Sequence, residues 1–127
     1  EYTQGWYGSE GDRSFFWCWA RGDAGYRINN PHPFAVKSRL RFSLFSAGRR
    51  SVLLKVNGED FWETTLAEDQ FITVSLSALK LRPGENILEW KTDAPPVMID
   101  SDPRELAFVI QNLHLDLLRE MPAGNTP

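Results

Sequence analysis

The sequence predicts an all-β fold, an antiparallel two-sheet sandwich of jelly-roll-like topology with about eight strands. Three features predict it: extended runs rich in β-branched and aromatic residues, turn residues between them at intervals of ~8 to 12 residues, and the lack of an amphipathic helical pattern. The chain of 127 residues is long enough to bury one core. We therefore expect a single β-sandwich domain over residues 1–120 and a flexible tail over residues 121–127.

The first residues of the domain have the composition of an irregular segment rather than of a strand. Residues 1–13 are rich in glycine and polar residues, and we expect them to pack on the sandwich through Trp6. Residues 14–20 follow as a strand that is aromatic at almost every position, which predicts that both of its faces are covered. At least one of Trp17 and Trp19 should therefore be buried.

Further strands are expected wherever an extended run is bounded by Gly, Pro, Asn or Asp. They are residues 26–29, 36–45, 52–56, 61–66, 71–76, 86–92 and 106–117. The dipeptide Asn57-Gly58 is the strongest hairpin signal, because a type I′ turn requires positive φ at both of its central residues. It predicts antiparallel pairing of the strands on either side. Residues 77–81 allow one helical turn, and residues 97–104 are expected to form a loop.

Alternation of apolar and polar residues assigns the two faces of two long strands. The residues expected to face the core are Leu40, Phe42, Leu44, Leu113, Leu115 and Leu117. Those expected on the other face are Lys37, Arg39, Arg41, Asn112, His114 and Asp116. The basic row could meet an acidic glycan, but we expect it to be solvated and balanced by neighbours such as Glu59, Glu63 and Glu89. The row around His114 has the composition of an exposed sheet face, so no catalytic role is assigned to it.

Composition and charge argue against several classes of function. The net charge is −3, from 14 Lys and Arg against 17 Asp and Glu, which argues against a nucleic-acid partner because polyanion binding needs clustered positive charge. Cys18 is the single cysteine, so neither an internal disulfide nor a thiolate metal site is expected. No apolar stretch is long enough for a transmembrane segment. Motifs for catalysis, phosphate binding and zinc binding are lacking too, so we expect no enzymatic activity, cofactor or metal.

Tryptophan is a candidate for carbohydrate contact, because the apolar face of a pyranose ring stacks on an exposed aromatic ring. The chain has five tryptophans, and core packing is the alternative for most of them. Trp90 is expected in the core. Trp62 follows Phe61 after the predicted hairpin and should face away from it, which makes Trp62 the best candidate for an exposed platform. Trp6, in the irregular segment, is the second candidate.

Glu10, Asp102 and Arg104 form another candidate group. The planar guanidinium of arginine binds carboxylates in pairs, so Arg104 is expected to clamp the first segment through Glu10 or to brace its own loop through Asp102. The alternative is that Asp102 and Arg104 hydrogen-bond sugar hydroxyls. Asp100-Ser101-Asp102 also has the Asp-x-Asp spacing of nucleotide-sugar transferases, but a small sandwich lacks their nucleotide-binding unit.

Short motifs in a fixed order resemble a known family. They are Gly5-Trp6-Tyr7-Gly8-Ser9-Glu10, Phe16-Trp17, Val56-Asn57-Gly58, Pro83-Gly84-Glu85-Asn86 and Ser101-Asp102-Pro103-Arg104-Glu105-Leu106. Together they are similar to accessory β-sandwich domains attached to bacterial glycosyltransferases and other glycan-assembly proteins, which are galactose-binding-like jelly rolls. The resemblance covers residues 5–117 and departs at Ala107, where we expect glycine. It implies a glycan context and a docked Trp6, and it supplies no mechanism.

These observations leave two functions open. The first is a non-catalytic accessory domain that binds glycan, or acceptor glycan, for an attached glycosyltransferase domain, and the parent chain could hold it at a membrane. The alternative is an interaction domain that packs on a partner protein or on its own parent chain and binds no sugar. An exposed aromatic ring in a concave sheet face would favour the first, and a flat apolar patch at an edge would favour the second.

Overall fold

The computed structural model describes residues 1–99 and 102–118, and every regular element in them is a β-strand. In chain order the strands are β1 (Glu10–Gly11), β2 (Phe16–Ala20), β3 (Ala24–Asn30), β4 (Val36–Ser46), β5 (Arg50–Val56), β6 (Glu59–Leu66), β7 (Phe71–Leu81), β8 (Gly84–Thr92), β9 (Val97–Ile99), β10 (Asp102–Leu106) and β11 (Phe108–Leu117). All the expected strands are present, and β1, β9 and β10 are additional. The tail expected at residues 121–127 lies outside the described residues. Within the described ranges, no helix is long and apolar enough to cross a membrane.

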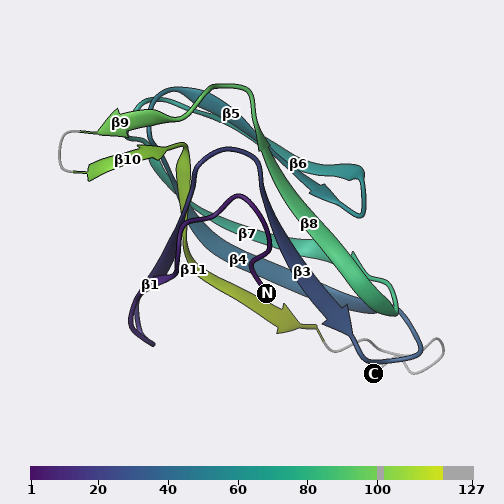
Figure 1. Ribbon diagram of the computed structural model, residues 1–127. Coiled ribbons are helices and arrows are strands. Elements are labelled where there is room, and N and C mark those ends of the chain that lie inside the picture. Colours follow the sequence, from purple (N-terminus) through teal and green to yellow (C-terminus); the bar gives the residue numbers. More distant parts are fainter. Residues whose placement is uncertain (100–101, 119–127) are drawn as a thin grey trace.

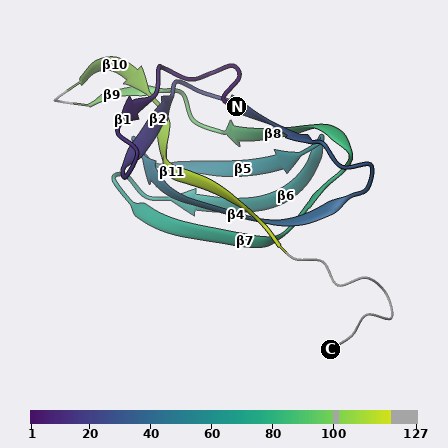
Figure 2. The same cartoon turned by 90° about the horizontal axis from the view of Figure 1, so that it is seen from below.

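The strands form two facing antiparallel sheets, as the sequence predicts. One sheet has five strands in the order β1-β2-β11-β4-β7, and the other has four in the order β3-β8-β5-β6. Figure 1 and the turned view in Figure 2 show the two layers. A separate hairpin of β9 and β10 lies at one end of the sandwich (Figure 2). The predicted all-β sandwich is therefore confirmed.

The core lies between the sheets and contains side chains from both. Trp90 of β8 and Phe108 of β11 are the largest fully buried side chains. The ring of Trp90 makes edge contacts with Trp6 and with Phe42, each at a centroid distance of 5.8 Å. The residues of β4 expected to face the core are buried, namely Leu40, Phe42 and Leu44. The core positions predicted for β4 and for Trp90 are thus confirmed.

The turn between β5 and β6 has the geometry that its sequence predicts. Asn57 has a φ of 51° and Gly58 a φ of 85°. Val56 pairs with Glu59 across the turn. Positive φ at both central residues is the requirement that favours Asn-Gly here.

Two expectations for the segments between the strands are wrong. Residues 77–81 form no helical turn, because β7 continues through them and pairs with the first residues of β4. The described part of the loop expected at residues 97–104 is strand, because 97–99 belong to β9 and 102–104 to β10, and Asp102 lies opposite Ile99. The first two residues of the Asp-x-Asp motif, Asp100-Ser101, lie outside the described residues. In both segments a second strand supplies hydrogen-bond partners for the backbone N–H and C=O groups. The local sequence does not reveal which strand that is.

Small residues of β2 are buried, and its tryptophans turn outward. Cys18 and Ala20 are buried, whereas Trp17 and Trp19 are both partly exposed. The expectation that one of the two tryptophans is buried is therefore wrong, since alternation gives the inner face of β2 to the small residues. The Cys18 thiol lies 3.1 Å from the backbone oxygen of Tyr7, and burial raises the pKa of this thiol.

The last strand changes character at Asn112, and the core does not cover its last leucine. Asn112 has a φ of 50° and lies in a bulge where the register between β11 and β4 shifts. Leu113 and Leu115 pack against the core. Leu117 pairs with the buried Ser38 and so lies on the expected face, but it is 60% exposed rather than buried. Pairing of β2 with β11 stops at Gln111, which leaves the end of β11 at the periphery of the sheet.

The N-terminal segment closes one open side of the sandwich. It runs between β2 of one sheet and β3 of the other, with single bridges from Tyr2 to Tyr26 and from Trp6 to Ala20. The short strand β1 also pairs with β2, so residues 1–13 are more regular than expected. These contacts join the edges of the two sheets.

Phe108→Ala should destabilise the sandwich by about 3 to 5 kcal/mol, because it removes a fully buried ring and leaves a cavity between the sheets. Urea unfolding followed by tryptophan fluorescence measures this loss. Phe34→Ala is the matched control, since Phe34 is 57% exposed, and it should change the free energy of unfolding by less than about 0.5 kcal/mol. Equal losses in the two variants would contradict the central position of Phe108.

Candidate functional site

The expected site residues divide between the two ends of the sandwich. Glu10, Asp102 and Arg104 come together beside the β9–β10 hairpin. Phe61 and Trp62 belong to the β5–β6 hairpin, whose turn lies at the opposite end (Figure 2). The two groups therefore cannot form one site.

Arg104 is the centre of the first group, the Arg104 cluster, which comprises Tyr7, Glu10, Asp102 and Arg104. Its Nη2 and Nε atoms donate to the Asp102 carboxylate at 2.6 Å and 3.0 Å. Both Nη atoms also reach Oε2 of Glu10 at 3.4 Å. The guanidinium lies over the Tyr7 ring, 5.0 Å from its centroid, in cation–π geometry. The cluster links the N-terminal segment to β10.

Hydrogen bonds within the Arg104 cluster stabilise its charged forms. Those from Arg104 lower the pKa of Asp102 below the usual range of a carboxyl group, and they raise the pKa of Arg104. One guanidinium contacts both carboxylates, which is the geometry that a clamp requires. Sugar binding by Asp102 and Arg104 stays a prediction, and a sugar hydroxyl would have to compete with these ion pairs.

Trp62 is not the exposed platform that alternation predicts. It pairs with Leu54, and the register then shifts so that Phe61 is the extra residue of a β-bulge. Partners across an antiparallel pair share a face, so Trp62 points inward with the buried Leu54. Its ring packs edge-on against Phe42 at a centroid distance of 5.8 Å. The sequence signal that could have predicted this bulge is the pair of adjacent aromatic residues, Phe61 and Trp62, in a strand that otherwise alternates.

Trp6 is docked into the sandwich, as the family resemblance implies. Its Nε1 donates to the backbone oxygen of Gly25 at 2.6 Å. Its ring makes edge contacts with Tyr2, Trp90 and Phe108. A direct sugar contact by Trp6 stays a prediction.

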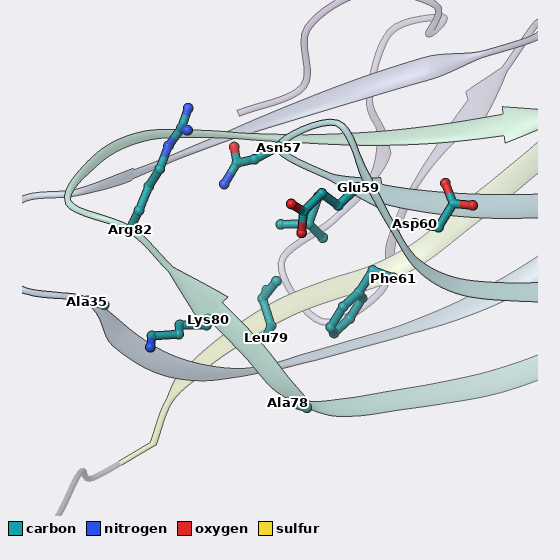
Figure 3. A pocket seen from close by; sticks show the side chains of 10 residues that line it. Ala35, Asn57, Glu59, Asp60, Phe61, Ala78, Leu79, Lys80 and Arg82 are labelled. Atoms are coloured by element: carbon teal, nitrogen blue, oxygen red, sulfur yellow. The ribbon is translucent and has the colours of Figure 1, made fainter.

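A hollow that the sequence does not predict lies beside the β5–β6 turn. This end pocket has a volume of about 420 Å³ and lies between the turn and the last residues of β7 (Figure 3). Its lining residues come from segments far apart in the sequence and include Val56, Glu59, Phe61, Leu79, Lys80 and Arg82. The pocket exists because β6 and β7, which are the edge strands of different sheets, lie near each other here.

The end pocket combines apolar surface with charged groups. Phe61 points from the hairpin towards β7, and Leu79 points from β7 towards the hairpin (Figure 3). Phe61 is only partly buried, so part of its ring is open to a ligand. Among the described residues, Glu59 and Lys80 have no salt-bridge partner. Their carboxylate and ammonium groups can therefore accept and donate hydrogen bonds to a ligand.

The described part of the chain has no arrangement of side chains suited to binding a metal ion. No group of three or more His, Cys, Asp or Glu side chains is placed there to hold a metal ion. In the end pocket, Asp60 pairs instead with Lys55, with 3.4 Å between Oδ1 and Nζ. The chemistry that this pocket offers is hydrogen bonding and apolar contact.

The basic row on β4 has its charge partner on the same sheet. Nε of Arg41 donates to Oδ2 of Asp116 at 2.7 Å, and this bond lowers the pKa of Asp116. The expected partners of the row are on the other sheet, namely Glu59, Glu63 and Glu89. For Arg41 that expectation is wrong, because the sequence does not reveal that β11 lies beside β4.

Comparison with known proteins gives similarity in structure alone. No family model matches the chain, and no curated protein matches it in sequence. A GH26-CBM35 β-(1,4)-mannanase from Podospora anserina is similar over 96% of this chain and 26% of its own, with 15% identity and a TM-score of 0.60. A Cry1Da tryptic core variant from Bacillus thuringiensis is similar over 83% and 19%, with 8% identity and a TM-score of 0.53. A family two carbohydrate esterase mutant from Clostridium thermocellum is similar over 93% and 32%, with 15% identity and a TM-score of 0.50.

These similarities show the fold, a β-sandwich. The chain spans only 26% of the mannanase, 19% of the Cry1Da variant and 32% of the esterase. At identities of 15% or less, the ligands of those proteins cannot be transferred residue by residue.

Arg104→Met should raise the pKa of Asp102 towards the ordinary aspartate value of about 3.9, because the side-chain hydrogen bonds that lower it most are lost while the one from the backbone N–H of residue 104 remains. An NMR titration of the carboxyl carbon measures this change. A carboxyl whose pKa is depressed on folding stabilises the folded state above its unfolded pKa, and this stabilisation disappears as the pH falls through the folded pKa. Arg104→Met should therefore remove part of the acid sensitivity below about pH 4.

Arg41→Met is the control for this titration, since it breaks an exposed ion pair with Asp116 and leaves the Arg104 cluster intact. It should not move the pKa of Asp102. Limited proteolysis of the two variants tests the clamp directly, because only Arg104→Met should expose the N-terminal segment to cleavage. Cleavage of the N-terminal segment that is unchanged in Arg104→Met would rule the clamp out.

Proposed function

We propose that this chain is a non-catalytic accessory domain that binds carbohydrate in the end pocket. The observation that carries the proposal is the partly buried ring of Phe61, which lies in a hollow with charged groups around it. Carbohydrate sites combine an aromatic face, which contacts the apolar face of a sugar ring, with polar groups that bond the hydroxyls. The end pocket offers both.

Each part of a sugar residue would have a contact in the end pocket. Phe61 supplies apolar surface above the fully buried Leu79, and the Glu59 carboxylate accepts hydrogen bonds from hydroxyl groups. Lys80 and Arg82 donate to hydroxyl or ring oxygens. The volume of about 420 Å³ is within the usual range for small-molecule sites, roughly 300 to 1,000 Å³. A short glycan segment or a chain end would therefore fit better than an extended polymer.

The parent protein that we propose assembles glycans. Support comes from the motifs that resemble accessory domains of bacterial glycosyltransferases. Two of the similar structures also belong to proteins named as a mannanase and a carbohydrate esterase. Attached to a transferase domain, the end pocket would hold an acceptor glycan near the place where the chain is extended.

An interaction domain without a sugar ligand is the second candidate, and one observation favours it. The β9–β10 hairpin exposes two apolar side chains, Val97 at 37% and Met98 at 65%. Exposed apolar residues on a projecting hairpin are typical of a contact with another protein. This surface is at the opposite end from the end pocket, so the two functions can be tested separately (Figure 2).

Phe61→Ala should weaken glycan binding by roughly ten- to a hundredfold, because burial of a phenylalanine ring contributes about 1.5 to 3 kcal/mol. Titration of the purified chain against a panel of soluble oligosaccharides, followed by calorimetry, measures the loss. Glu59→Gln should weaken binding less, since it keeps the shape of the side chain but removes its charge. The matched control is Glu68→Gln in the exposed turn after β6.

Two results would count against the proposal. Binding by Phe61→Ala equal to that of the wild type would exclude the end pocket. Failure of the wild type to bind any member of a broad panel would favour the interaction domain, and Met98→Ser would then be the variant expected to lose its partner.

A further inference from the structure

The outer face of the five-stranded sheet carries a row of aromatic rings that the fold leaves uncovered. Strand register places Trp19 of β2, Val109 of β11, Phe45 of β4 and Phe71 of β7 side by side. Trp17 lies two residues before Trp19 on the same face. Phe71 is 52% exposed, and the other three rings are partly exposed. We call Trp17, Trp19, Phe45 and Phe71 the outer aromatic row.

The outer aromatic row is long enough to contact a chain of sugars rather than one ring. Neighbouring strands lie about 4.8 Å apart, so the row extends about 14 Å from β2 to β7. The rings of Trp19 and Phe45 have centroids 6.1 Å apart. Val109, between them in the register, is buried although it lies on the outer face. Trp19, Val109 and Phe45 thus form a continuous apolar surface, and the register places Phe71 next to Phe45.

A polar hollow adjoins this row on the same face. It has a volume of about 290 Å³, and its lining includes Ser43, Thr73, Ser75, Arg41, Asn112 and His114. The hydroxyl groups of Ser43 and Thr73 are 3.5 Å apart. Register places Ser43 and Thr73 in the row next to Phe45 and Phe71. Stacking surface and hydrogen-bonding groups therefore lie side by side.

The outer aromatic row and its hollow differ from the end pocket in their charge. The guanidinium of Arg41, at the rim of the hollow, is neutralised by its ion pair with Asp116 at 2.7 Å. Ser43 and Thr73 add hydroxyl groups without charge. A surface of this kind complements a neutral glycan, because no unpaired charge is desolvated when the glycan binds.

We propose that the outer aromatic row and its hollow are a second carbohydrate-binding surface, which binds an extended chain of a neutral polysaccharide. The rings stack on the faces of successive sugars, and the hydroxyl and amide groups of the hollow bond to their hydroxyls. Phe71 is the first residue of β7, and Leu79 of the end pocket is near its other end, so the two surfaces are distinct. This surface would hold the domain on a polymer and leave the end pocket free.

Adsorption of the purified chain to insoluble cellulose and insoluble mannan tests the proposal, with depletion from the supernatant as the measurement. The wild type should adsorb to at least one of them, and Phe71→Ala should lower the adsorption constant by about tenfold or more. Phe34→Ala is the matched control, because Phe34 is similarly exposed but lies outside the outer aromatic row. Urea unfolding checks that Phe71→Ala is as stable as the wild type, and Trp17→Ala provides a second variant of the row.

Salt concentration and the end-pocket variant separate this proposal from the alternatives. Raising NaCl from about 0.05 M to about 0.5 M should leave adsorption unchanged, since a neutral glycan has no charges to screen. Phe61→Ala should lose binding of soluble oligosaccharides and keep adsorption, so that failure of one surface does not hide the other.

Four outcomes would overturn the proposal. They are no adsorption by the wild type, equal adsorption by Phe71→Ala, adsorption that salt abolishes, and a dimer in light scattering that Phe71→Ala dissociates. The last result would assign the outer aromatic row to contact with a second copy of the chain.

Discussion

Burial of apolar side chains between two antiparallel sheets is the interaction on which the rest of the structure depends. Trp90 and Phe108 are fully buried in this layer. Trp6, from the N-terminal segment, packs against both of them and extends the core. With the inner faces covered, the ends of the sandwich and its outer faces are the surfaces that remain for ligands. Both proposed carbohydrate surfaces are of this kind, one at an end and one on an outer face.

Much of the fold could be predicted because strand alternation and turn chemistry are local properties. The turn at Asn57-Gly58 can be predicted because these two residues readily adopt the positive φ that it needs. The alternation of β4 can be predicted because only one face of this strand lies against the core. The strands that the sequence does not reveal depend on partners distant along the chain. Residues 77–81, 97–99 and 102–104 form strands because another strand is available to pair with them.

The candidate site is harder to predict from the sequence. A shift of the strand register by one residue changes which side chains line it, and its two walls come from different sheets. One extra residue at Phe61 turns Trp62 inward, which reverses the face that simple alternation assigns to it. The end pocket also needs the edges of two different sheets to meet, and no local pattern contains that information. The Arg104 cluster is easier to predict, because Arg104 attracts the carboxylate of Asp102 in its own motif and that of Glu10 in a separate one.

The position of Cys18 has a practical consequence. Its thiol is buried on β2 and lies against the backbone of Tyr7, so the N-terminal segment shields it from solvent. A thiol-specific reagent can reach this sulfur only when the segment lifts away from the sheet. The rate at which Cys18 is labelled therefore measures how often the N-terminal segment detaches from the sheet. The same shielding protects the purified protein from forming disulfide-linked dimers in air.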